Sequence, residues 1–122
     1  MANFKSRLDG LPANATKVSI VSFQEQAQGW LAYIHRARKP GDIVKGFFHL
    51  QGLLTDYANV EVLPFDQQAM AEFLNLRRLR IHIGTSDLRI AAIARVNGVK
   101  LLSRNLRDFR QVPGLDVEDW TV

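Results

Sequence analysis

The sequence predicts an α/β domain in which a short parallel sheet is covered by helices. Short runs of apolar and β-branched residues at 17–21, 60–63 and 99–102 predict strands. Stretches with apolar residues at three- and four-residue spacing separate these runs and predict helices. Because strands that alternate with helices pair in parallel through right-handed crossovers, we expect helices on both faces of the sheet.

The first predicted strand, 17–21, leads into two helices. Trp30, Leu31 and Ile34 have helical spacing, and Pro40-Gly41-Asp42 interrupts the pattern. A second amphipathic stretch runs from Ile43 to about Tyr57. We expect the two helices to form a hairpin.

The second half alternates in the same way. After the strand at 60–63, Pro64-Phe65-Asp66 introduces a helix that Asp66 is expected to cap. A helix over about 86–96 follows Gly84-Thr85, and Asn97-Gly98 ends it by supplying a residue that tolerates left-handed backbone angles. The strand at 99–102 comes next, and 115–117 is expected to be an edge strand.

Length and composition favour one domain spanning residues 1–122. The chain has 122 residues, of which 47% are hydrophobic and 23% charged, which is typical of a globular protein. No apolar run reaches the ~20 residues of a membrane span, and the first residues do not resemble a signal peptide, so we expect a cytoplasmic protein without a membrane partner. The sequence contains no cysteine, so any metal must be bound by oxygen or imidazole.

Positive charge is concentrated in one segment. Residues 77–110 contain nine basic side chains, and their only acidic residues are Asp87 and Asp108. Such an excess is expected where a surface meets phosphates. A solvated face or an acidic protein partner would explain it equally well.

Oxygen-bearing side chains follow two of the predicted strands and begin one of the predicted helices. In parallel sheets, ligands bind beyond the carboxyl ends of the strands. Each of these side chains has a structural explanation. Glu25 would complete a capping box with Ser22 as the cap, Asp87 would stabilise the positive end of its helix, and Asp108 would form a turn. Together with Asn105 they would instead make a hard-oxygen site for Mg²⁺ or Mn²⁺. Two carboxylates about 4 Å apart repel by roughly 4 kcal/mol, which a bound cation offsets.

The sequence resembles the PIN ribonucleases, and in particular their VapC-type toxins. Three blocks carry the resemblance, in matching order and spacing. They are Arg80-Ile81-His82-Ile83-Gly84-Thr85-Ser86-Asp87-Leu88-Arg89-Ile90-Ala91-Ala92-Ile93-Ala94, Leu101-Leu102-Ser103-Arg104-Asn105-Leu106-Arg107-Asp108-Phe109, and the stretch from Val112-Pro113-Gly114-Leu115 to Trp120. Val18-Ser19-Ile20-Val21-Ser22-Phe23-Gln24-Glu25 resembles the family's second strand and following helix, so the similarity runs from about Lys17 to Trp120.

The resemblance implies a PIN-like three-layer fold and a Mg²⁺- or Mn²⁺-dependent endoribonuclease, the toxin of a toxin–antitoxin pair. It places Glu25, Asp87, Asn105 and Asp108 in the catalytic metal site, with Asn105 at a position where many relatives have aspartate. Arg104 and Arg107 would bind RNA. The implied partners are RNA, a cognate antitoxin and a second copy of the chain in a homodimer.

The sequence departs from the family at its beginning. PIN proteins open with a hydrophobic strand that ends in an aspartate, followed by a helix. We expect this strand and helix to be absent here, because the run from Phe4 to Leu8 has no strand pattern and Asp9 follows no strand. The first metal aspartate would then be missing and cleavage impaired. The alternatives are a non-catalytic remnant that binds RNA or an antitoxin, and an interaction protein that uses the helical hairpin at 23–57.

A missing central strand would expose the edges of the strands at 17–21 and 99–102. Exposed apolar edges recruit another strand. We therefore expect these two strands either to pair directly with each other or to be covered in a closely associated dimer.

Overall fold

The computed structural model describes residues 3–4, 17–103 and 106–119. Its five strands are β1 (Asn3–Phe4), β2 (Lys17–Ser19), β3 (Glu61–Leu63), β4 (Lys100–Ser103) and β5 (Val117–Asp119). Its helices are α1 (Ile20–Arg36), α2 (Pro40–Ala58), α3 (Gln67–Arg78), α4 (Thr85–Asn97) and α5 (Leu106–Phe109). The strands form one sheet in the order β3-β2-β1-β4-β5, and every pairing is parallel. The predicted α/β fold with a short parallel sheet is confirmed.

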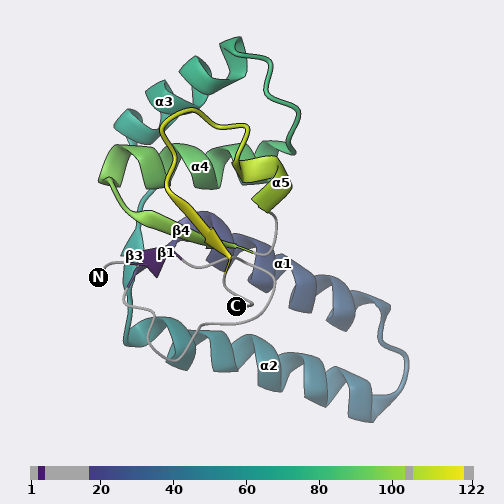
Figure 1. Cartoon of the computed structure of the whole chain (residues 1–122). Coiled ribbons are helices and arrows are strands. Elements are labelled where there is room, and N and C mark those ends of the chain that lie inside the picture. The colour runs from purple at the N-terminus through teal and green to yellow at the C-terminus, as the bar shows by residue number, and fades with distance from the viewer. Residues whose placement is uncertain (1–2, 5–16, 104–105, 120–122) are drawn as a thin grey trace.

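Helices cover the sheet in layers. In Figure 1, α3 and α4 lie above the sheet, and the long hairpin of α1 and α2 lies below it. Consecutive residues of β3 point to opposite faces of the sheet. Val62 packs in the apolar cluster between the sheet and the α1–α2 hairpin, and Leu63 packs in the cluster between the sheet and α4. The hairpin, expected from the break at Pro40-Gly41-Asp42, is confirmed.

The larger core cluster is centred on α4. This helix is buried on nearly all sides, from Leu88 through the run Ile90–Ala94, between α3 and the sheet. Gly98 ends it with φ of 62°, the left-handed conformation that glycine adopts without steric cost. Asp66 caps α3 as expected, since the Ala69 amide donates to its Oδ1 at 2.9 Å.

The prediction about the central strand is wrong. Asn3 and Phe4 form β1, which pairs with Lys17 of β2 on one side and with Lys100 and Leu101 of β4 on the other. β2 and β4 therefore neither pair directly nor leave a gap that requires a second copy. A two-residue strand carries no alternating pattern for a sequence to reveal, and it is selected by the backbone bonds of both neighbours. The expected loss of the family's first helix concerns residues 5–16, which lie outside the described part of the chain.

The start of α1 also differs from the expectation. The helix begins at Ile20, and its cap is Ser19, whose Oγ accepts from the Ser22 amide at 2.9 Å. The hydroxyl groups of Ser19 and Ser22 are hydrogen-bonded at 3.0 Å, and both residues are buried. The capping box with Ser22 as the cap is therefore wrong, and Glu25 lies in the second turn of α1.

Candidate active site

Two of the predicted site residues, Glu25 and Asp108, lie in helices that follow strands, and Asp87 lies in a helix that follows α3. α1 starts directly after β2, and α5 follows β4 with only residues 104 and 105 between them. The parallel order β2-β1-β4 brings these two strand ends to the same edge of the sheet. Glu25 belongs to α1, Asp108 to α5, and Asp87 to the first turn of α4.

Asp87 is the most buried acidic side chain among those that the structure describes. It is 6% exposed and lies at the N-terminal end of α4, where the helix dipole favours a negative charge. No side chain caps this helix, whose N-cap is Gly84. A carboxylate taken out of water needs compensating interactions, and the helix end supplies part of them.

Glu25 faces the interior from α1. Its side chain is half-buried, and its Oε1 atom is almost completely removed from solvent. The charge of this carboxylate affects the pKa of Tyr57 in α2. Burial, together with the negative charges of Asp56 and Glu25, raises the pKa of Tyr57 to about 12. The Tyr57 hydroxyl donates to Gln26 Oε1 at 3.0 Å.

The third segment is only partly described. Asp108 is half-buried in α5, and the neighbouring Arg107 is exposed to solvent. Asn105 and Arg104, both predicted site residues, lie outside the described residues.

The described residues do not make a complete metal site. Within 3–4, 17–103 and 106–119, no group of three or more acidic, histidine or cysteine side chains is arranged to hold a metal ion. Glu25 and Asp87 offer buried hard-oxygen donors, the ligand type that Mg²⁺ and Mn²⁺ prefer. A complete coordination shell would need a further ligand from the rest of the chain, such as Asn105, or water.

Sequence patterns missed two residues near these acids. Gln24 and Arg89 line a pocket beside the first turn of α1. By sequence alone, Arg89 is one basic residue among nine, and Arg89 and Gln24 each belong to a stretch that resembles the PIN ribonucleases without a role of their own. Their proximity depends on the packing of α1 against α4, which no local spacing encodes.

Comparison with known proteins links the chain to the VapC ribonucleases. No family model matches it. It is 34% identical over 67 residues to the tRNA(fMet)-specific endonuclease VapC of Salmonella typhimurium, covering 52% of this chain and 51% of that protein. It is 50% identical over 67 residues to ribonuclease VapC2 of Haemophilus influenzae, with the same coverage. The chain thus spans about half the length of the curated relatives it matches.

Solved structures resemble the whole chain. The VapBC2 complex of Rickettsia felis bound to promoter DNA matches with a TM-score of 0.72 and 20% identity, covering 98% of this chain and 99% of the matched chain. DNA-bound VapBC of Salmonella typhimurium matches with a TM-score of 0.73 and 21% identity, covering 98% of both chains. Identity at this level shows a shared fold.

In the part of the chain that the structure describes, no helix has the length and hydropathy needed to cross a membrane. The parallel sheet with its strand order, the sequence similarity and the match to solved structures all indicate the same fold. The resemblance inferred from the sequence is therefore confirmed: the chain has the PIN-like fold of the VapC toxins and shares sequence with VapC ribonucleases.

Proposed function

We propose that this chain is a PIN-type, metal-dependent endoribonuclease and the toxin of a toxin–antitoxin pair. The observation that carries the proposal is the buried Asp87 at the start of α4, at the helix position that the family uses for a metal ligand. The sequence similarity to VapC ribonucleases supports it.

In this proposal Glu25, Asp87, Asn105 and Asp108 bind Mg²⁺ or Mn²⁺. When bound, such an ion activates water and stabilises the charge that develops on a phosphodiester during hydrolysis. The protein's own contribution is to hold these oxygen atoms on rigid elements. Asp87 is fixed by a helix embedded in the core, and Glu25 by a helix anchored through Ser19 to the end of β2.

Arg104 and Arg107 would bind phosphates next to the cleaved bond. The exposed position of Arg107 beside half-buried Asp108 supports this role. Phosphate contacts supply affinity and salt dependence, and they do not select a base sequence.

We propose that catalysis is weak, because β1 supplies no carboxylate to the site. PIN proteins carry an aspartate at the end of the central strand, whereas here Phe4 is followed by Lys5-Ser6-Arg7. A non-catalytic module that binds RNA or an antitoxin is the second candidate, and the same observation favours it.

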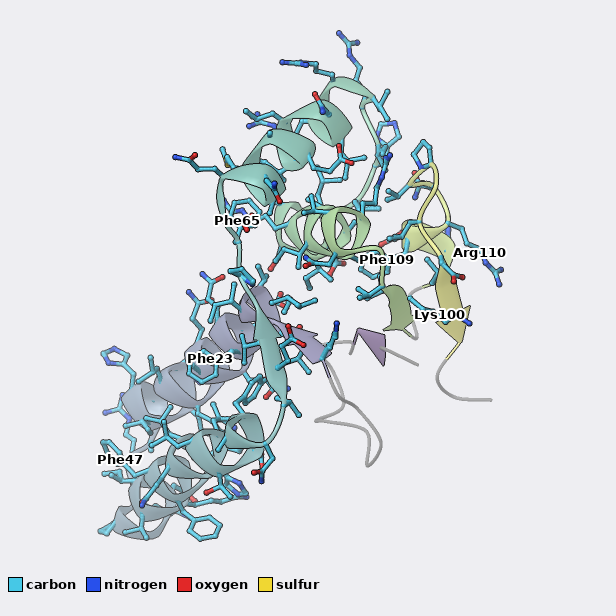
Figure 2. The ribbon with its side chains drawn as sticks, turned by 90° about the vertical axis from the view of Figure 1, so that its left-hand side faces the viewer. Phe23, Phe47, Phe65, Lys100, Phe109 and Arg110 are labelled. Atoms are coloured by element: carbon cyan, nitrogen blue, oxygen red, sulfur yellow. The ribbon has the colours of Figure 1, made fainter. Side chains whose placement is uncertain are left out.

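The proposed partners also include an antitoxin and a second copy of the chain. α2 is apolar on two faces: Gly46, Leu53 and Tyr57 are buried toward the protein, while Val44, Phe47, Phe48 and Leu54 are exposed. Figure 2 shows Phe47 on the hairpin, away from the sheet. An apolar helix face of this kind is typical of an interaction surface.

The test compares the wild type with Asp87→Asn. We expect Mn²⁺ to bind the wild type weakly in calorimetry and to support slow RNA cleavage that EDTA abolishes, and we expect Asp87→Asn to lose both. Asp116→Asn is the matched control, because exposed Asp116 precedes β5 and so lies at the opposite edge of the sheet. Cleavage that survives Asp87→Asn would refute the assignment, and RNA binding without metal binding or cleavage would favour the binding module.

A further inference from the structure

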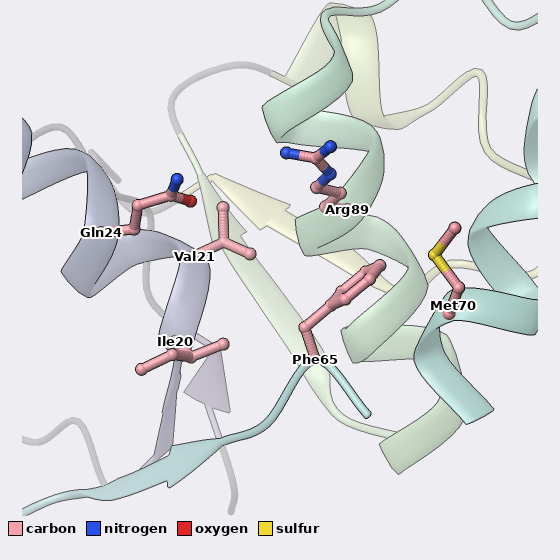
Figure 3. A pocket seen from close by; sticks show the side chains of 6 residues that line it. All are labelled: Ile20, Val21, Gln24, Phe65, Met70 and Arg89. Atoms are coloured by element: carbon pink, nitrogen blue, oxygen red, sulfur yellow. The ribbon is translucent and has the colours of Figure 1, made fainter. Parts of the chain in front are cut away.

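A pocket of about 440 Å³ lies beside the first turns of α1. Three of its residues come from α1, one from the loop after β3, one from α3 and one from α4, as Figure 3 shows. In that order they are Ile20, Val21 and Gln24, then Phe65, Met70 and Arg89. The pocket is therefore built where three helices meet the ends of β2 and β3.

The pocket combines an apolar floor with a polar rim. Ile20 and Met70 are large apolar side chains, yet 38% and 42% of their surfaces are exposed, so the floor is open to a ligand. In Figure 3 the side chains of Gln24 and Arg89 point toward each other from α1 and α4. The glutamine amide offers both a donor and an acceptor, and the guanidinium offers donors only.

The rim is positively charged. The guanidinium groups of Arg89 and Arg77 each lie 5.6 Å from the centre of the Phe73 ring. Met70 and Arg89 also line a second pocket of about 440 Å³, to which Arg77 and Phe73 belong. Among the described residues, no acidic side chain lines either pocket, so the two pockets favour a ligand that carries negative charge.

This pocket is close to the candidate active site. Gln24 directly precedes Glu25, so the two side chains leave α1 about 100° apart. Arg89 is two residues after Asp87 in α4, so these two side chains leave the helix about 200° apart. The link between the pocket and the candidate active site therefore runs through α1, where a polymer bound at Glu25 could place its next unit beside Gln24.

We propose that this pocket binds one unstacked nucleobase of a single-stranded RNA, with Gln24 on the base edge and Arg89 on the adjacent phosphate. The inference rests on the proposed ribonuclease function and adds the residues that would select a base. The apolar faces of a nucleobase match the pocket floor, and its polar edge matches the Gln24 amide. The phosphate linked to the base matches the Arg89 guanidinium. An apolar protein side chain would fill the floor but leave the two polar rim groups without matched partners.

The experiment measures binding of four short fluorescein-labelled RNAs, oligo(A), oligo(C), oligo(G) and oligo(U), by anisotropy in EDTA. EDTA removes divalent metal and so separates binding from cleavage. We expect the tightest and weakest of the four to differ roughly tenfold in affinity for the wild type. Gln24→Ala should reduce this difference to about twofold, because the group that reads the base edge is removed.

Arg89→Gln should weaken binding of all four RNAs and make the salt dependence shallower by about one phosphate contact. The matched control is Arg78→Gln, which removes the same charge from an exposed residue of α3 that contacts Asn75. This control should preserve the base preference. Equal thermal midpoints for the three variants and the wild type would establish that each is folded.

Two results would overturn the inference. The first is that the wild type shows no base preference, or that Gln24→Ala keeps the preference of the wild type. The other is that the pocket variants bind RNA normally but lose affinity for the antitoxin, which would assign the pocket to a protein side chain. RNA that binds with base preference and is not cleaved with Mn²⁺ would refute the ribonuclease function alone, and cleavage without base preference would refute the pocket alone.

Discussion

Close packing of the helical hairpin depends on one glycine. Gly46 of α2 is buried against α1, where a methyl group at its position would lie 2.5 Å from Ile34 Cγ1 and 3.0 Å from Tyr33 Cδ1. Carbon atoms in contact prefer a separation of about 3.5–4.0 Å. Gly46→Ala must therefore shift Ile34 or separate the two helices.

Gly52 of the same helix provides the matched control, because a methyl group there meets nothing within 4 Å. Replacing either glycine by alanine gains about 1 kcal/mol from helix propensity. Only Gly46→Ala also incurs overpacking, which costs about 1–3 kcal/mol. The free energies of unfolding of the two variants should thus differ by about 1–3 kcal/mol, with Gly52→Ala the more stable.

Thermal unfolding followed by circular dichroism measures this difference. For a chain of this size 1 kcal/mol corresponds to roughly 3–5 °C, so the midpoint of Gly46→Ala should be about 3–15 °C below that of Gly52→Ala. Urea titrations of the two variants should give the same order. Equal midpoints would refute the reasoning, since they would mean that α1 and α2 are not in close contact at Gly46.

Three further changes test other parts of the structure. Asp66→Ala should lower the free energy of unfolding by about 1 kcal/mol in urea titration, because the Ala69 amide loses its cap; an unchanged urea midpoint would contradict the cap. Folding raises the pKa of Tyr57 from 10.0 to about 12. The protonated hydroxyl therefore contributes its full stabilisation of the folded state below pH 10, and this contribution is lost as the pH rises toward 12. Tyr57→Phe should therefore show a smaller loss of stability over that range in alkaline melts, and identical pH profiles would exclude the effect. Phe48→Ser replaces an exposed apolar side chain of α2 and should weaken the proposed self-association in sedimentation, whereas unchanged self-association would place the interface elsewhere.

The sequence by itself determined the elements whose signals are local. Helical spacing and the break at Pro40-Gly41-Asp42 predicted the hairpin, because apolar residues at a helical period must be buried along one face. Asp66 and Gly98 were predicted correctly as helix ends, since a cap depends only on the backbone of its own turn. The short strands between helices predicted the parallel sheet.

Tertiary structure decided what depends on distant partners. Asn3 and Phe4 are a strand only because β2 and β4 supply backbone bonds on both sides. The choice of Ser19 over Ser22 as the cap follows from where β2 stops pairing with β3, at Ser19 and Leu63. Both serines can cap a helix locally, and the sheet register selects one of them.

The same distinction holds for the candidate site. The sequence placed Glu25 shortly after a strand and Asp87 at the start of a helix, because those positions follow from chain order. It could not show that Gln24 and Arg89 face one pocket, because they are 65 positions apart (89 − 24) and meet only through the packing of α1 against α4. Local periodicity determines the elements of this protein, and the packing of its helices against the sheet determines which side chains can meet a ligand together.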